Sequence, residues 1–207
     1  MSGNDASPTP SERFKNNLLV FLEFFEEMFD EAKEENIIVE RFSLFIPAKV
    51  IISKTKGVSI VDVFIKRTNQ FWDNIHDQDD EKIEEICTNL FQMVQNGNLE
   101  DMKQDEDLKG VGGIIGSLSK GHVENFKKVL TGKYQDDGET ISIFDEERRE
   151  NLWQYLKSFV KISLCHIHET RKMGGDGKYK VKFFPDINVK SLAQKWNVKT
   201  IPILSEV

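Results

Sequence analysis

The stretch from Glu150 to Lys172 reads ENLWQYLKSFVKISLCHIHETRK and carries the clearest structural pattern in the chain. Apolar side chains recur in it every three or four residues, the spacing that places them on one face of an α-helix. The pattern predicts a long helix that forms the spine of a hydrophobic core, with Trp153 and Phe159 buried. The stripe consists of Trp153, Leu156, Val160, Leu164 and Ile167, widened by Leu152, Tyr155, Phe159 and Ile162.

The flanking residues set the ends of this helix. Asp145 is the expected N-cap, and two glutamates follow it in the first turn. Arg171 and Lys172 occupy the last turn, so each charge lies where the helix dipole stabilises it. A Gly-Gly pair at 174 then ends the pattern. We therefore expect one helix over residues 145–173.

The same stretch holds a cysteine and two histidines, which suggests a metal or catalytic site. A helix turns by about 100° per residue, so His166 and His168 diverge by about 200° and cannot share one metal ion. Cys165 and His168 can share a face, but the chain has only one other cysteine, Cys87, and two other histidines to complete a ligand set. We predict no metal, no cofactor and no catalytic residue here, and interpret both cysteines as reduced, buried thiols, with Cys165 a small apolar filler.

No other segment fits a known catalytic or binding motif. The glycine-rich segment 110–121, GVGGIIGSLSKG, has the spacing of neither a phosphate-binding loop nor a dinucleotide-binding turn. The segment 133–144, KYQDDGETISIF, lacks the acidic residues that a calcium loop needs at its first and twelfth positions. We interpret 98–121 as a surface loop and do not predict an enzyme. A catalytic site built from scattered residues is kept as an alternative.

The rest of the chain is also mainly helical in pattern. Pro47 predicts a break, because the residue before a proline avoids the helical conformation. Further helices are expected over 12–35, 48–54, 59–75, 81–95 and 123–130. Ser11 is the expected N-cap of the first of these helices, and Gly57 is expected to close the second. A short strand over 178–184 and a small helix from Asp186 are expected to follow. The fold class is thus mainly α: an irregular multi-helix bundle with at most a small β element.

Composition and charge indicate the domain organisation and the expected cellular location. The chain has 207 residues, a net charge of −7, fifteen Phe and three Trp, which suits one soluble domain with its own core. We expect a disordered arm over 1–12, a helical domain over 13–173 and a basic C-terminal tail over 174–207 with a short amphipathic helix. No apolar run is long enough to span a bilayer and no signal peptide is visible, so we expect a cytoplasmic location.

The tail differs in charge from the acidic remainder of the chain. From residue 174 onward it holds six lysines, no arginine and three acidic residues, with aromatic residues between them. Such a segment can contact nucleic acid or an acidic protein surface. The alternative is that its strand and helix pack on the bundle through the aromatics. The partner-binding candidates are Lys178, Lys180, Lys182, Phe183, Phe184, Lys190, Lys195 and Trp196.

Two stretches resemble a recurring group of mostly uncharacterised proteins encoded by giant nucleocytoplasmic DNA viruses. One contains Phe71-Trp72-Asp73 and Ile75, then Asp79, Asp80, Glu81, Asn89 and Phe91; the other is FDEERRENLWQYLKSFVKISLCHIHETR, residues 144–171. That group shares a helix with a Trp-Asp pair and a later helix of the form D-E-x-x-R…W-x-Y…H-I-H-E. The resemblance implies a viral factory in the host cytoplasm, or a virion, as the setting.

These observations predict a non-enzymatic structural or interaction protein, such as a minor virion or virus-factory component, that binds protein partners. The first alternative is a nucleic-acid-associated protein that uses the basic tail. The second alternative is an enzyme with an unrecognised site.

Overall fold

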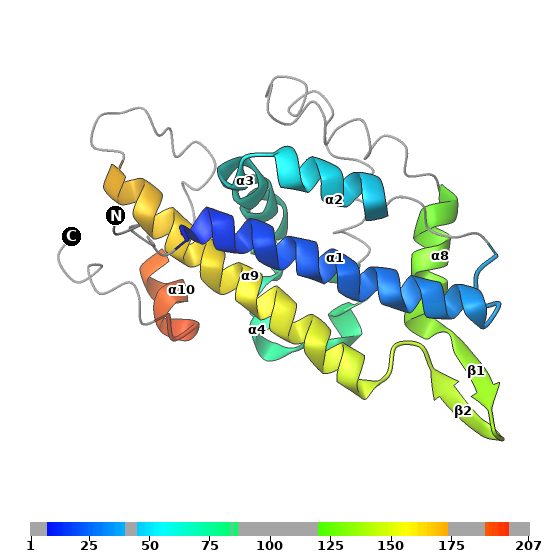
Figure 1. The fold of residues 1–207 in the computed structure, drawn as a ribbon. Helices are drawn as coiled ribbons and strands as arrows, with labels where there is room; N and C mark the ends of the chain where they lie inside the picture. Colours follow the sequence, from blue (N-terminus) through cyan, green and yellow to red (C-terminus); the bar gives the residue numbers. More distant parts are fainter. Residues whose placement is uncertain (1–7, 40–44, 84, 87–119, 174–188, 199–207) are drawn as a thin grey trace, which may run out of the picture.

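The computed structural model describes residues 8–39, 45–83, 85–86, 120–173 and 189–198, and it is mainly helical, as the sequence predicts (Figure 1). Among these residues one antiparallel hairpin is the only sheet. The elements are α1 (Pro10–Glu34), α2 (Phe45–Lys54), α3 (Gly57–Thr68), the 3-10 helix η1 (Asn69–Phe71), α4 (Trp72–Asp77), α8 (Lys120–Thr131), β1 (Lys133–Asp136), β2 (Glu139–Ser142), α9 (Glu146–Met173) and α10 (Val189–Lys195). Residues 80–83 and 85–86 are also helical.

The two long helices α1 and α9 lie side by side through the middle of the molecule, and the shorter elements surround them (Figure 1). Aromatic rings fill the space between them. The ring centroid of Phe14 on α1 lies 4.8 Å from that of Phe159 on α9 and 5.0 Å from that of Phe64 on α3. Contacts between tilted rings at these distances add to the stabilisation that burial provides. The prediction that the helix over 145–173 forms the spine of the core is confirmed.

Helix α9 agrees with its sequence pattern along its whole length. The carboxylate of Asp145 accepts a hydrogen bond from the backbone N–H of Arg148 at 2.8 Å, which is the expected N-cap. Trp153 is 2% exposed and Phe159 is buried, as predicted. An ion pair of 2.5 Å between Arg148 and Glu31 joins the start of α9 to the end of α1.

Helix α1 begins two residues earlier than predicted. Its N-cap is Thr9 rather than Ser11, because the side chains of Thr9 and Glu12 form a capping box. Ser11 is instead buried against the start of α3. A Cβ atom added at Gly57 would lie 2.5 Å from the carbonyl oxygen of Ser11. Gly57 therefore allows two helices to approach closely and begins α3, and the prediction that it closes α2 is wrong.

Helix α2 begins at Phe45, so the predicted break at Pro47 is also wrong. Pro47 is the third residue of α2, where the backbone nitrogen has no intrahelical acceptor to lose.

The predicted helix 59–75 is divided into α3, η1 and α4. At this division the indole N–H of Trp72 donates a hydrogen bond to the hydroxyl of Thr68 at 3.1 Å.

The hairpin of β1 and β2 was not predicted. Asp137 and Gly138 form its turn with φ values of 45° and 85°. Two consecutive positive φ values define the two-residue turn that favours Asp-Gly, so the dipeptide itself was the available signal. The predicted strand over 178–184 and residues 98–119 of the predicted loop lie outside the described residues. The last two residues of that loop, 120 and 121, belong to α8, which begins three residues earlier than the helix predicted over 123–130.

None of the described helices combines the length and the apolar character needed to cross a membrane.

Candidate functional site

The structure describes only part of the predicted partner-binding tail. Lys178, Lys180, Lys182, Phe183 and Phe184 lie outside the described residues. Lys190 lies in α10, where its backbone is described but its side chain is not. The side chains of Lys195 and Trp196 are both described. Their contacts indicate whether α10 packs on the bundle or offers these residues to a partner.

Lys195 and Trp196 both attach α10 to the bundle. The ammonium of Lys195 lies 2.6 Å from a carboxylate oxygen of Asp73 on α4, and this hydrogen bond raises the pKa of Lys195. The ring of Trp196, 3% exposed, meets that of His76 edge to face at a centroid distance of 5.1 Å. These two candidates are engaged inside the molecule, which favours the packing alternative for α10.

The three residues that suggested a metal site differ in their surroundings on α9. His166 faces α3, where its Nε2 lies 3.1 Å from Oδ1 of Asp62, and it is 4% exposed. His168 is buried, whereas Cys165 is only partly buried. The expectation of a buried Cys165 is therefore wrong, because the residue is only half-buried at the edge of the apolar stripe.

The pair of His166 and Asp62 resembles part of a catalytic triad, and Ser163 lies one turn earlier on α9. Nucleophilic catalysis needs the hydroxyl within hydrogen-bond reach of the histidine and open to substrate. The Ser163 hydroxyl is buried and makes no hydrogen bond within the part of the chain that the structure describes. Because both Ser163 and His166 are closed to solvent, we interpret the His166–Asp62 pair as a polar link between α9 and α3.

Within the described ranges no group of three or more His, Cys, Asp or Glu side chains could hold a metal ion. The absence of a structural metal stays a prediction for the whole chain. Metal analysis of protein purified without chelator tests it. One tightly held zinc ion per chain that is lost in Cys165→Ser would contradict the prediction.

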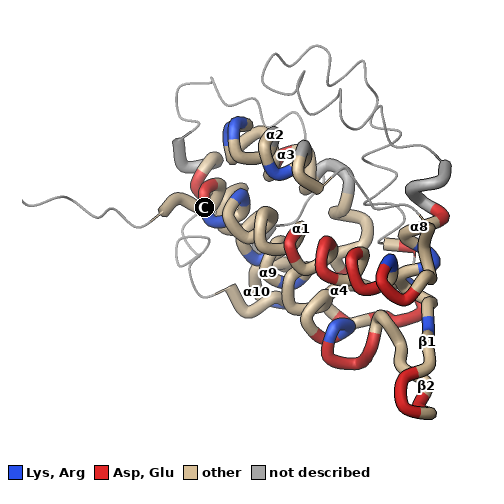
Figure 2. The backbone as a smooth tube through the Cα atoms, turned by 45° about the vertical axis from the view of Figure 1, so that its right-hand side comes forward, with Lys and Arg blue, Asp and Glu red and all other residues tan. Residues whose placement is uncertain are grey.

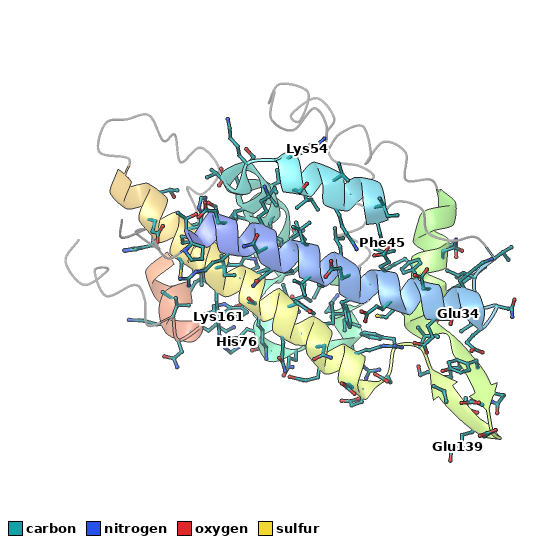
Figure 3. The ribbon with its side chains drawn as sticks, viewed as in Figure 1. Glu34, Phe45, Lys54, His76, Glu139 and Lys161 are labelled. Carbon is teal, nitrogen blue, oxygen red and sulfur yellow. The ribbon has the colours of Figure 1, made fainter. Side chains whose placement is uncertain are left out.

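Helix α2 combines an apolar sequence with exposed aliphatic side chains. Its sequence FIPAKVIISK is apolar on almost every side, which is typical of a helix that is covered all round. One side is covered by α1: Phe45 is buried with its ring 5.4 Å from that of Phe29 (Figure 3). Lys49 lies 2.5 Å from Glu26 of α1, and Lys15 of α1 donates to the carbonyl of Ser53. Contacts along the whole helix thus fix α2 on α1.

Two described side chains of α2 point away from α1 and are open to solvent. Ile46 and Val50 lie one turn apart and are 65% and 46% exposed. We call these two residues the outer face of α2. Val20, on the helix beneath, is exposed as well. Single exposed aliphatic residues are common, but neighbouring ones on an apolar helix are typical of a contact surface.

Negative charge lies beside this face. Glu23 of α1 lies 3.8 Å from Lys49 and is more than half exposed, so it borders α2 directly. Acidic residues continue along the second half of α1 (Figure 2). They are Glu23, Glu26, Glu27, Asp30, Glu31, Glu34 and Glu35. Of these, Glu26 is paired with Lys49 and Glu31 with Arg148, whereas Glu23 borders α2 and is more than half exposed. The geometry therefore suits an apolar surface that carries a basic residue near Glu23.

Comparisons with protein-family models, with curated proteins and with solved structures found no match to this chain.

The sequence analysis did not identify the outer face of α2. Its signal was the apolar composition of residues 45–54, from which the sequence predicts only a short helix over 48–54. Periodicity identifies a covered side when polar residues occupy the other side. Here both sides are apolar, so only the position of α1 shows which one stays exposed.

Proposed function

We propose that the protein is a non-catalytic interaction protein that binds a protein partner through the outer face of α2. The observation that carries this proposal is the exposure of Ile46 and Val50 on a helix that α1 holds in place. Because the helix is fixed before binding, the partner meets a preformed surface and little conformational entropy is lost. The resemblance to giant-virus proteins supports a virus factory or a virion as the setting.

The partner's chemistry follows from the surface. Ile46 and Val50 require an apolar complement, such as one face of an amphipathic helix, and the acidic border on α1 favours Lys or Arg around it. Complete burial of an aliphatic side chain contributes about 1.5–3 kcal/mol. Scaled by the exposed fractions of the two residues, the outer face contributes about 2–3 kcal/mol, or a factor of about 30–150 in affinity.

Co-purification from the native source tests the proposal. The tagged full chain is compared with Ile46→Glu/Val50→Glu, which places two charges on the outer face of α2. Val39→Glu is the matched control, because Val39 is an exposed aliphatic residue outside α2, at 79% exposure. Quantitative mass spectrometry measures the partners, and circular dichroism checks that each variant folds.

We expect a partner in stoichiometric amount with the wild type and with Val39→Glu, and its loss from the double variant. An unchanged set of partners in a folded double variant would refute the role of the outer face of α2.

A further inference from the structure

A cavity of about 340 Å³, broadly open to solvent, lies where the start of α1, the second half of α9 and the residues after α10 meet. Figure 3 shows Lys161 on α9 close to this junction. The cavity is lined by Pro10, Arg13, Lys161, Ile162, Cys165, Asn197 and Val198. Its volume lies within the range of small-molecule sites, about 300–1,000 Å³.

Two positive charges border this cavity. Arg13 of α1 and Lys161 of α9 come from different helices and converge on it. The Nε of Arg13 donates to the carbonyl of Pro8 at 3.1 Å, which leaves the other guanidinium donors available. Within the described ranges neither residue forms an ion pair with a carboxylate. Among the residues that the structure describes, an anion that enters the cavity would therefore displace no carboxylate from these two cations.

The remaining wall is mostly apolar. Pro10, Ile162 and Val198 contribute hydrocarbon surface, and the partly buried thiol of Cys165 lies among them. Inorganic phosphate would leave this surface uncovered, and a neutral apolar molecule would leave the two cations without a counter-charge. The combination fits a molecule with one anionic end and a short hydrocarbon body.

We propose that this cavity binds a small organic carboxylate. The carboxylate pairs with Arg13 and Lys161, and its apolar body covers Ile162 and Val198. This function goes beyond the proposed protein contact and is independent of it, because no residue of α2 lines the cavity.

Cys165 provides the readout, since it is one of the residues that line the cavity. In a Cys87→Ser background, the rate of Cys165 alkylation by uncharged iodoacetamide is measured with increasing octanoate. Octanamide, which has the same chain length without the charge, is the matched control ligand. We expect octanoate to slow alkylation and to need a concentration about ten times lower than octanamide for the same effect.

Variants test the two cations. In Arg13→Gln/Lys161→Gln the concentration of octanoate that gives half-protection should rise about tenfold. Lys157→Gln, one turn earlier on α9 and outside the cavity lining, should leave it unchanged. Thermal unfolding confirms that each variant is folded. Equal protection by octanoate and octanamide, no protection at all, or full protection in the folded double variant would each overturn the proposal.

Discussion

Replacement of Trp153 by alanine tests whether α9 is the spine of the core. The side chain is 2% exposed, and its indole N–H donates a hydrogen bond to Asp80 at 3.0 Å. This bond ties α9 to the helical residues that begin at position 80. The substitution removes the ring and the hydrogen bond together, so both losses contribute to the change in the free energy of unfolding.

The magnitude follows from the size of the ring. Truncation of a buried tryptophan to alanine costs about 3–5 kcal/mol, because a cavity remains where the ring was. For a chain of this size each kcal/mol lowers the melting temperature by about 2–4 °C, so a fall of about 6–20 °C is expected. Urea denaturation followed by circular dichroism at 222 nm measures the free energy directly.

Two control variants separate the ring from its hydrogen bond. Trp153→Phe keeps most of the apolar volume and should cost about 1–2 kcal/mol, whereas Asp80→Asn keeps an acceptor oxygen and should cost less than about 0.5 kcal/mol. A loss below about 1 kcal/mol in Trp153→Ala would refute the reasoning, because a ring in the core cannot be removed at so small a cost.

The remaining predictions concern the helix starts. Gly57→Ala should lower the free energy of unfolding by about 1–3 kcal/mol, because its Cβ would lie 2.5 Å from the Ser11 carbonyl oxygen; a stabilised variant would refute this close approach. Thr9→Ala should cost about 1 kcal/mol through the loss of the N-cap, measured by urea denaturation. Hydrogen bonds from the backbone and side chain of Thr9 lower the pKa of Glu12, so their contribution to stability is present above the unfolded-state pKa and lost as the pH falls through the folded-state value. The stability difference between the wild type and Thr9→Ala should therefore shrink in acid, and NMR titration should show a higher pKa for Glu12 in the variant. An unchanged Glu12 pKa would contradict the hydrogen bond that the Thr9 hydroxyl donates to Glu12.

The long helices were predictable because their periodic patterns extend over many turns. Helix α9 repeats its apolar spacing from Leu152 to Ile167, and its cap and end charges agree with that spacing. The hairpin was missed because a period-2 pattern over four residues is short, although Asp137-Gly138 carried the turn signal. The division of residues 57–77 was not predictable, because a hydrogen bond such as that of Trp72 to Thr68 is not visible in periodicity.

The functional residues were less predictable than the fold. Composition identified a basic tail, but it could not show that Lys195 meets Asp73, a residue 122 positions earlier. It also could not show that α1 covers one side of α2 and leaves Ile46 and Val50 exposed. The convergence of Arg13 and Lys161 likewise depends on two helices meeting. Each of these facts requires the tertiary arrangement.

Solvent accessibility of the outer face of α2 in the native assembly tests the central claim most directly. Ile46→Cys and Val39→Cys are each introduced into a background without the two native cysteines and are labelled with a membrane-permeant maleimide in the native source. Both positions should be labelled at similar rates in the purified chain, because both are exposed. A partner on the outer face of α2 predicts strong protection of position 46 in the native assembly and none at position 39. Equal labelling of the two positions there would contradict the account.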